Sequence, residues 1–147
     1  MTTKMLYGHT ANYSWKLHSD KEVYILKCAD FYKIGVSENV NERMKNIQAE
    51  NPMLVELIYR SGEHYPAHKL AYGFEHEYHR ILKKHNMHLH HEWFDLTKEM
   101  VENVIEWIKE DFAEIDNLIP ENPDKLGRIY IQHRPTGDRE NVLKTAA

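Results

Sequence analysis

The sequence predicts an α+β fold in which short strands and helices alternate along one domain. Two observations support this class. Three runs of β-branched and aromatic residues, at 22–28, 31–36 and 53–59, have the character of strands. Between and after them, apolar residues recur three and four positions apart, which is the spacing of an amphipathic helix.

The first two strands are expected to form a hairpin. Glu22–Cys28 and Phe31–Val36 are rich in Val, Tyr and Ile, and only Ala29-Asp30 separates them. A two-residue connection between such runs is typical of an antiparallel pair. Cys28 is the single cysteine, so it forms no internal disulfide, and we expect a buried, inert thiol.

A helix and a third strand follow the hairpin. Ser37 can cap the helix, and Asn39 with Glu42 is a competing capping pair. Asn51-Pro52 ends the helix, because the residue before a proline disfavours helical geometry. Met53–Tyr59 is the third strand. The side chains expected to form the buried stripe of this helix are Val40, Met44 and Ile47.

Two longer helices complete the predicted domain. Pro66 opens the first and Thr97 caps the second, and a short extended piece at His91–Phe94 joins them. The first helix should bury Leu70, Phe74, Tyr78, Ile81 and Leu82. The second should bury Val101, Val104, Ile105, Ile108 and Phe112. Gly127–His133 is a further candidate strand.

We expect the domain to span residues 21–115, with an N-terminal arm at 1–20 and a C-terminal extension at 116–147. The formal net charge is -4, so local positive charge would have to hold a nucleic acid. No apolar run approaches the roughly 18 residues that span a membrane, and the N-terminus lacks a signal-peptide core. These features favour a cytoplasmic protein, in the host cytoplasm if a phage encodes it.

Charge is distributed unevenly between the last helix and the tail. Acidic side chains gather on the helix, at Glu99, Glu102, Glu106, Glu110, Asp111 and Glu114. Basic ones gather in the tail, at Lys125, Arg128, Arg134, Arg139 and Lys144. These are either solvated surfaces or surfaces for a protein partner.

Several polar residues stand beside the predicted core positions. Glu75 and His79 are four residues apart on one helix face, so together they could hold a divalent cation or form an ordinary surface pair. Arg43 borders the buried stripe of the helix that follows the hairpin, and it could brace a phosphate or pair with Glu42 or Glu50. Lys33 occupies a strand face expected to be partly covered, unless it protects an edge strand.

A histidine-rich segment precedes the last helix. It contains His85, His88, His90 and His91. A zinc site is one interpretation, although the spacing matches no tetrahedral template and no cysteine lies nearby. The alternatives are imidazoles that contact phosphate and plain surface histidines.

Taken together, these residues resemble the GIY-YIG endonuclease superfamily, in the phage-type subgroup with degenerate signature triplets. Val23-Tyr24-Ile25 and Lys33-Ile34-Gly35 stand where the two triplets would be, and Arg43 lies in the following helix. Residues 75–79 look like that subgroup's Glu-x-x-apolar-His motif, and residues 92–94 look like its closing Glu-Trp-Phe. Gln48 and Asn51-Pro52 also fit, and the resemblance covers residues 21–113.

The resemblance implies a β-β-α-β-α core with a small, mostly antiparallel, three-stranded sheet flanked by helices. It also implies metal-dependent hydrolysis of phosphodiester bonds in DNA, with RNA not excluded. Glu75 would bind a single Mg²⁺ or Mn²⁺. Arg43 would stabilise the transition state, and Tyr24 would contact or deprotonate the attacking water, helped by a neighbouring base.

Two further roles follow from the same resemblance. Lys33 would replace the second tyrosine and either lower the pKa of Tyr24 or touch the phosphate. His79 would lie close to Glu75, as a phosphate contact or a supporting group. The residues expected to contact nucleic acid are Tyr32, Ser37, Gln48, Asn51, His64 and His91.

The alternative function is a catalytically silent protein with the same fold. It would bind nucleic acid, or a protein partner through the acidic helix or the tail. The sequence leaves the oligomeric state open. Substrate selection would depend on the first 20 residues, the tail from Gly127 and the loop around His64-Tyr65.

Overall fold

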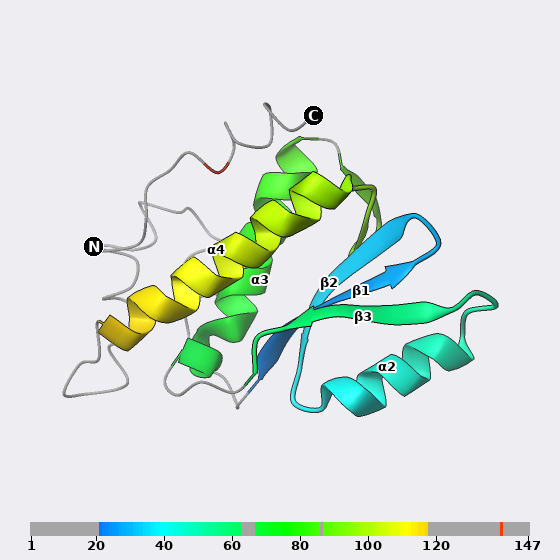
Figure 1. Cartoon of the computed structure of the whole chain (residues 1–147), viewed down its shortest axis with the longest axis horizontal. Helices are drawn as coiled ribbons and strands as arrows, with labels where there is room; N and C mark the ends of the chain where they lie inside the picture. Colours follow the sequence, from blue (N-terminus) through cyan, green and yellow to red (C-terminus); the bar gives the residue numbers. More distant parts are fainter. Residues whose placement is uncertain (1–20, 63–66, 86, 118–138, 140–147) are drawn as a thin grey trace.

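The computed structural model describes residues 21–62, 67–85, 87–117 and Arg139 (Figure 1). The predicted arm, the strand at 127–133, Pro66 and His64 lie outside these residues. The elements, in order, are β1 (Glu22–Cys28), β2 (Phe31–Ser37), α2 (Val40–Ala49), β3 (Val55–Arg60), the 3₁₀ helix η1 (Ala67–Leu70), α3 (Ala71–Lys84), β4 (His88–His90), β5 (Trp93–Phe94) and α4 (Lys98–Asn117).

Among the described residues, the sheet has five strands in the order β3-β1-β2-β5-β4, and all four neighbouring pairs are antiparallel. The α+β class is therefore confirmed, whereas the expected count of three strands is wrong. Both additional strands come from the short segment around His91. Each is only two or three residues long, too short for an alternating pattern to be visible in the sequence.

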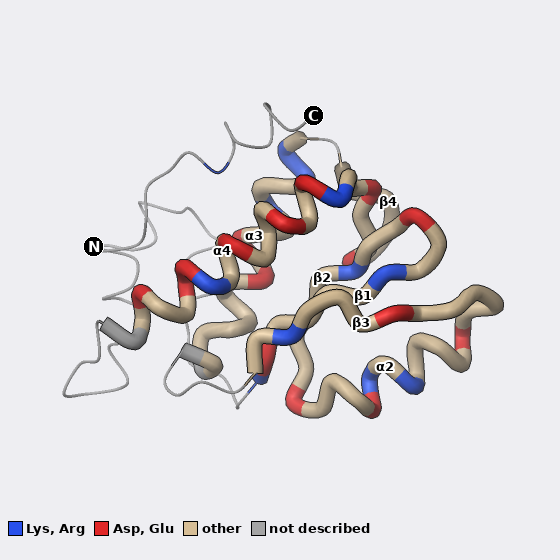
Figure 2. Tube along the Cα trace, in the orientation of Figure 1, with Lys and Arg blue, Asp and Glu red and all other residues tan. Residues whose placement is uncertain are grey.

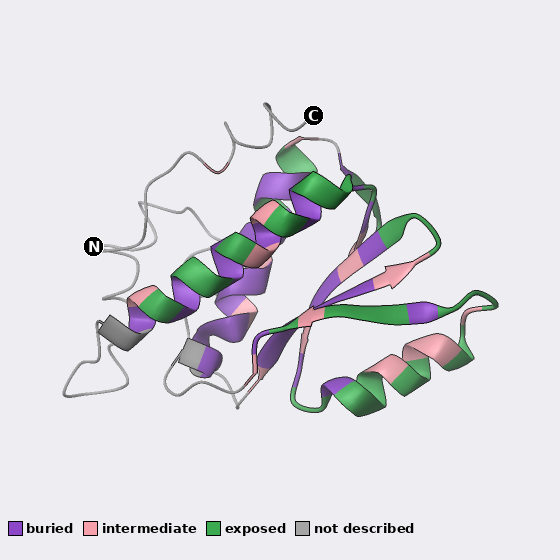
Figure 3. Cartoon of the chain, in the orientation of Figure 1, coloured by how far each residue is buried: buried purple, intermediate pink, exposed green. Residues whose placement is uncertain are grey.

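Helices cover both faces of this sheet. Side chains alternate along β1, so Val23 and Ile25 pack with α3 and α4, whereas Tyr24 and Leu26 pack with α2. Figure 1 shows α3 and α4 together on one side and α2 alone on the other. The α3 and α4 side holds the larger core, and α2 remains mostly exposed (Figure 3).

Polar caps fix the helix starts. Asn39, and not Ser37, caps α2, because its Oδ1 accepts a hydrogen bond from the Glu42 backbone amide at 3.1 Å. Ser37 Oγ instead accepts from the Asn39 amide at 3.0 Å. Thr97 caps α4 as predicted, since its Oγ1 accepts from the Met100 amide at 3.2 Å.

The end of α2 is tied to β3 by side-chain amides. Gln48 Oε1 accepts a hydrogen bond from the Val55 amide at 2.7 Å, and Asn51 Nδ2 donates to the Ile47 carbonyl at 2.7 Å. Cys28 lies beside this junction and is half-buried, so the prediction of a buried thiol is wrong.

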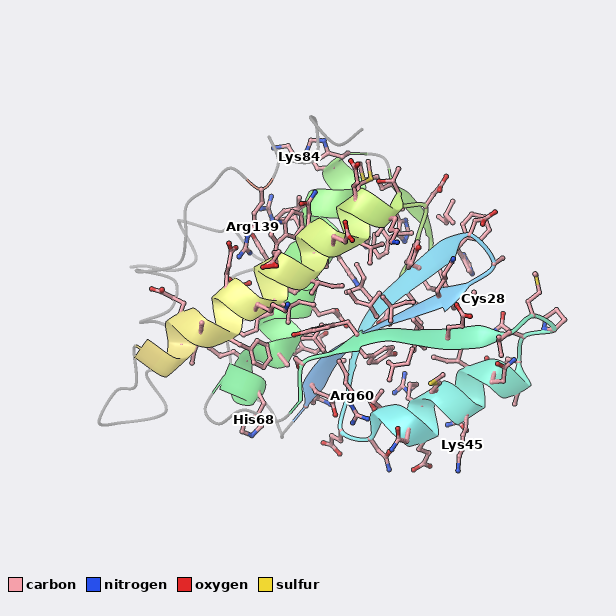
Figure 4. All side chains as sticks on the ribbon, viewed as in Figure 1. Cys28, Lys45, Arg60, His68, Lys84 and Arg139 are labelled. Carbon is pink, nitrogen blue, oxygen red and sulfur yellow. The ribbon has the colours of Figure 1, made fainter. Side chains whose placement is uncertain are left out.

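One tail residue is docked on the helical layer. Arg139, labelled in Figure 4, pairs its guanidinium with buried Asp111 on α4 at 2.8 Å, and the Tyr78 hydroxyl donates to the same carboxylate at 2.7 Å. The interpretation of the basic tail as fully solvated is therefore wrong at Arg139. No helix among the described residues is long and apolar enough to cross a membrane.

Candidate active site beside the central strand

Tyr24 lies at the centre of the site. It faces α2 from β1 and pairs across the sheet with Gly35 on β2. A β-carbon on residue 35 would lie 2.6 Å from the Tyr24 hydroxyl oxygen and 3.0 Å from Glu92 Oε1. Only glycine leaves room for this approach, so the Tyr24 hydroxyl oxygen and Glu92 Oε1 both lie directly above Gly35.

The Tyr24 hydroxyl is buried and has no hydrogen-bond partner among the described residues. Burial, followed by the charge of Glu92, raises the pKa of this hydroxyl far above its ordinary value. The guanidinium of Arg43 lies close enough to act in the opposite direction, although no hydrogen bond of acceptable geometry joins it to the hydroxyl. The expectation of a lowered pKa is therefore wrong for the free protein, and Tyr24 is a neutral phenol.

Lys33 points to the same face of β2. Its ammonium lies 3.0 Å from Glu92 Oε1 and 5.7 Å from the centre of the Trp93 ring. Because β2 lies between β1 and β5, the interpretation of Lys33 as an edge-strand lysine is wrong. The ammonium is a partly buried cation held at the site by Glu92.

β2 is paired with β5 only at Tyr32 and Lys33. One residue further, Ile34 donates its amide to the Glu92 carbonyl at 3.2 Å and offers its own carbonyl to His79 Nε2 at 2.7 Å. Because β5 pairs with β2 over only two residues, the Ile34 carbonyl remains available to a side chain of α3. This bond anchors the helix face that carries Glu75 and His79 to the central strand.

Glu75 carries a buried carboxyl group, and the interpretation as an ordinary surface pair with His79 is wrong. Burial, followed by the charge of Glu92, raises the pKa of Glu75 to about 8, whereas the Lys33 charge acts to lower it. Burial lowers the pKa of His79 to about 4, against the raising effect of its hydrogen bond to Ile34. Glu77 is also buried, but it pairs with Arg80.

Arg43 is exposed on α2, directly beside the half-buried Met44. Its charge acts on the Tyr24 hydroxyl. It forms no ion pair with Glu42 or Glu50, which are both described, so that interpretation is wrong. The structure therefore brings together Tyr24, Lys33, Arg43, Glu75 and His79.

The residues predicted to contact nucleic acid are placed differently. Tyr32 belongs to the core, and Ser37, Gln48 and Asn51 make the local hydrogen bonds described above. His91 is exposed at the turn between β4 and β5, where its φ is 52°. His64 lies outside the described residues, and these contacts stay predictions.

The histidine-rich segment does not assemble a cation site of its own. Within the described parts of the chain, no group of three or more His, Cys, Asp or Glu side chains could hold a metal ion. His88 Nε2 instead lies 2.5 Å from the His91 carbonyl, and its ring packs against Phe94. The zinc interpretation therefore receives no support from the described histidines.

Glu92 belongs to the site, although the sequence analysis names it only as part of a motif and not among the candidate catalytic or metal-binding residues. It was visible in the closing Glu-Trp-Phe motif, but its place opposite Lys33 depends on the pairing of β2 with β5. No local pattern in the sequence gives that pairing.

The T5orf172 domain matches residues 20–109, which is more than half of the chain and includes every site residue. This chain belongs to the T5orf172 domain family. That family is associated with GIY-YIG-like and HNH-type phage endonucleases. Searches of curated proteins and of solved structures each found no significant match.

Proposed function

We propose that this T5orf172 domain protein is a metal-dependent endonuclease that hydrolyses DNA through a GIY-YIG-type site. One observation carries the proposal. The Tyr24 hydroxyl is buried without a partner among the described residues, where the charges of Glu92, Arg43 and Glu75 meet. A buried polar group in that state costs free energy, which is typical of a site that a ligand completes.

The residues fit a divalent cation. Glu75 is buried, and its carboxylate accepts no hydrogen bond from the part of the chain that the structure describes. A hydrated cation held by one or two carboxylates matches this donor set. When bound, it would neutralise charge on the phosphate and on the leaving 3′ oxygen.

Four side chains of the protein carry out the rest of the proposed reaction. The neutral Tyr24 hydroxyl orients the attacking water, and Glu92 takes the proton that the water loses. As the oxygen–phosphorus bond forms, the bond from phosphorus to the 3′ oxygen breaks. Arg43 and Lys33 oppose the negative charge that develops on the phosphate.

The test uses the full chain with single- and double-stranded DNA and RNA, in Mg²⁺, Mn²⁺ or EDTA, with products resolved on gels. Cleavage is expected with a divalent cation and not with EDTA. Glu75→Gln should abolish it, whereas Glu102→Gln, on the exposed face of α4, should not. The proposal fails if all four substrates stay intact with both cations, or if Glu75→Gln cleaves normally.

A second candidate function is binding without turnover. Glu99, Glu102, Glu106 and Glu110 are exposed along α4, and Figure 2 shows acidic residues along this helix. Such a surface suits a basic protein partner. This candidate is favoured if the chain binds nucleic acid or a basic protein and cleaves no substrate.

A further inference from the structure

The two ring nitrogens of His79 have different surroundings. Nε2 lies 2.7 Å from the Ile34 carbonyl oxygen. A carbonyl can only accept, so Nε2 carries a hydrogen and donates it. The ring also packs on Phe94, with the two centroids 5.0 Å apart. These two contacts fix both the orientation of the ring and the nitrogen that bears the hydrogen.

The other nitrogen, Nδ1, faces the Glu75 carboxylate. The distance from Nδ1 to Glu75 Oε1 is 3.7 Å, which is too long for a direct hydrogen bond. Both side chains are nearly buried, with 11% and 8% of their surface exposed. A nitrogen lone pair and a carboxylate oxygen therefore face each other across a gap with no hydrogen bond between them.

We propose that Nδ1 of His79 is a metal ligand beside Glu75, and that this site prefers a first-row transition ion such as Mn²⁺ or Co²⁺ to Mg²⁺. The inference rests on the proposed function, because it concerns the same cation. Bonds of about 2.0–2.2 Å from nitrogen and from oxygen can reach one ion placed between atoms 3.7 Å apart.

The backbone bond of His79 supports this assignment independently. A metal-bound histidine almost always donates its other ring N–H to a carboxylate or a backbone carbonyl. His79 makes this contact with Ile34. The i,i+4 spacing on α3 places the second donor, Glu75, on the same helix face.

The donor set also predicts selectivity. Mg²⁺ binds oxygen ligands and keeps several waters, so a nitrogen donor contributes little to its affinity. Affinity at a nitrogen and oxygen site rises from Mn²⁺ to Co²⁺. The described residues offer no third side-chain donor at this pair, which leaves positions for water or phosphate oxygens.

The test measures binding to the intact chain without nucleic acid, by calorimetric titration with Mg²⁺, Mn²⁺ and Co²⁺. The native chain should bind Mn²⁺ at least tenfold more tightly than Mg²⁺, and Co²⁺ more tightly still. His79→Gln keeps a donor for Ile34 but removes Nδ1, so it should lose about 10- to 100-fold of its Mn²⁺ affinity. His76→Gln, three residues before His79 on the same helix, is the matched control. It should keep the native affinities and their order, with Mg²⁺ weakest and Co²⁺ tightest.

A second measurement needs no variant. Pulsed electron paramagnetic resonance of Mn²⁺ on the native chain should show coupling to a directly bound nitrogen. Equal affinities for Mn²⁺ and Mg²⁺, or bound Mn²⁺ without that coupling, would overturn the inference. A chain that binds Mn²⁺ through nitrogen but cleaves nothing rejects the proposed function alone. A chain that cleaves DNA while its bound Mn²⁺ shows no nitrogen coupling rejects this inference alone.

Discussion

The Tyr24 ring lies so close to Gly35 that a β-carbon at residue 35 would approach its hydroxyl oxygen to 2.6 Å and its ring carbon Cζ to 2.7 Å. The two residues are direct partners in the β1–β2 ladder. Gly35 therefore sets the depth at which the phenol is buried.

Gly35→Ala should destabilise the fold and reduce cleavage. The added methyl group overlaps a buried ring, and overpacking of this kind costs about 1–3 kcal/mol. Urea denaturation measures the cost, and a cleavage assay follows the displaced hydroxyl. In a Tyr24→Ala background the same substitution should cost much less, because its steric neighbour is gone. Equal costs in both backgrounds would show that the two residues do not interact.

Tyr24→Phe should stabilise the protein while it removes activity. The hydroxyl is buried without a described partner, so its loss relieves an unfavourable desolvation. We expect a gain on the order of 1 kcal/mol in the free energy of unfolding. Turnover should fall at least 100-fold, because the attacking water loses its orienting group. A loss of stability would mean that the hydroxyl is already satisfied in the free protein.

The sequence predicts the hairpin, the helices and most core positions, because their patterns are local. On α2 the prediction is right for Val40 only, since Met44 and Ile47 are half-buried. Motifs in the sequence point to Tyr24, Lys33 and Glu75 as candidate site residues, and Asn39 is one of the two caps that the sequence offers for α2. β5 lies within the extended piece expected at His91–Phe94, but the sequence does not predict β4 or the place of either strand in the sheet, because this pairing is decided by backbone contacts between strands. The place of Glu92 beside Lys33 depends on that pairing.

The electrostatics of the site could not be predicted in the same way. Burial is the first cause of the shifted pKa values of Tyr24, Glu75 and His79. Burial depends on how α3 and α2 close over the sheet, and no spacing in the sequence encodes it. The lowered pKa expected for Tyr24 was wrong for this reason.

The stability of the metal-free protein should fall between pH 6.5 and 8. Glu75 has a folded pKa of about 8, above its ordinary 4.5, so the folded state holds the extra proton across this window. The lowered pKa of His79 makes stability rise with pH, but only between about pH 4 and pH 6.5. The expected loss from pH 6.5 to 8 is on the order of 2 kcal/mol. Denaturation curves at several pH values measure it.

Glu75→Gln is the control for this pH dependence, because it removes the titrating carboxyl and should flatten the curve over the same window. Added divalent cation should also reduce the slope, since it binds the ionised carboxylate and releases the proton. An unchanged slope in Glu75→Gln would assign the titration to another group.

Glu92→Gln should lower turnover by about 100- to 10,000-fold, the range for loss of a general base. It also leaves the Lys33 ammonium, whose side chain is 12% exposed, without its partner at 3.0 Å. Denaturation should therefore show a moderate loss of stability. Adding Lys33→Met should restore stability but not cleavage. Recovery of both would show that Glu92 acts only through the ion pair.

Arg43→Ala should slow cleavage far more than it weakens DNA binding. The guanidinium is exposed on α2, so its removal should change the free energy of unfolding by less than about 0.5 kcal/mol. Its charge matters most when negative charge builds up on the phosphate, so kcat should fall while the dissociation constant for DNA stays nearly constant. Single-turnover kinetics and equilibrium binding separate the two quantities.

Lys45→Ala, also exposed on α2, is the matched control and should change neither kcat nor the dissociation constant. If Arg43→Ala reduces affinity and rate by the same factor, Arg43 anchors the phosphate in the ground state and does not favour the transition state.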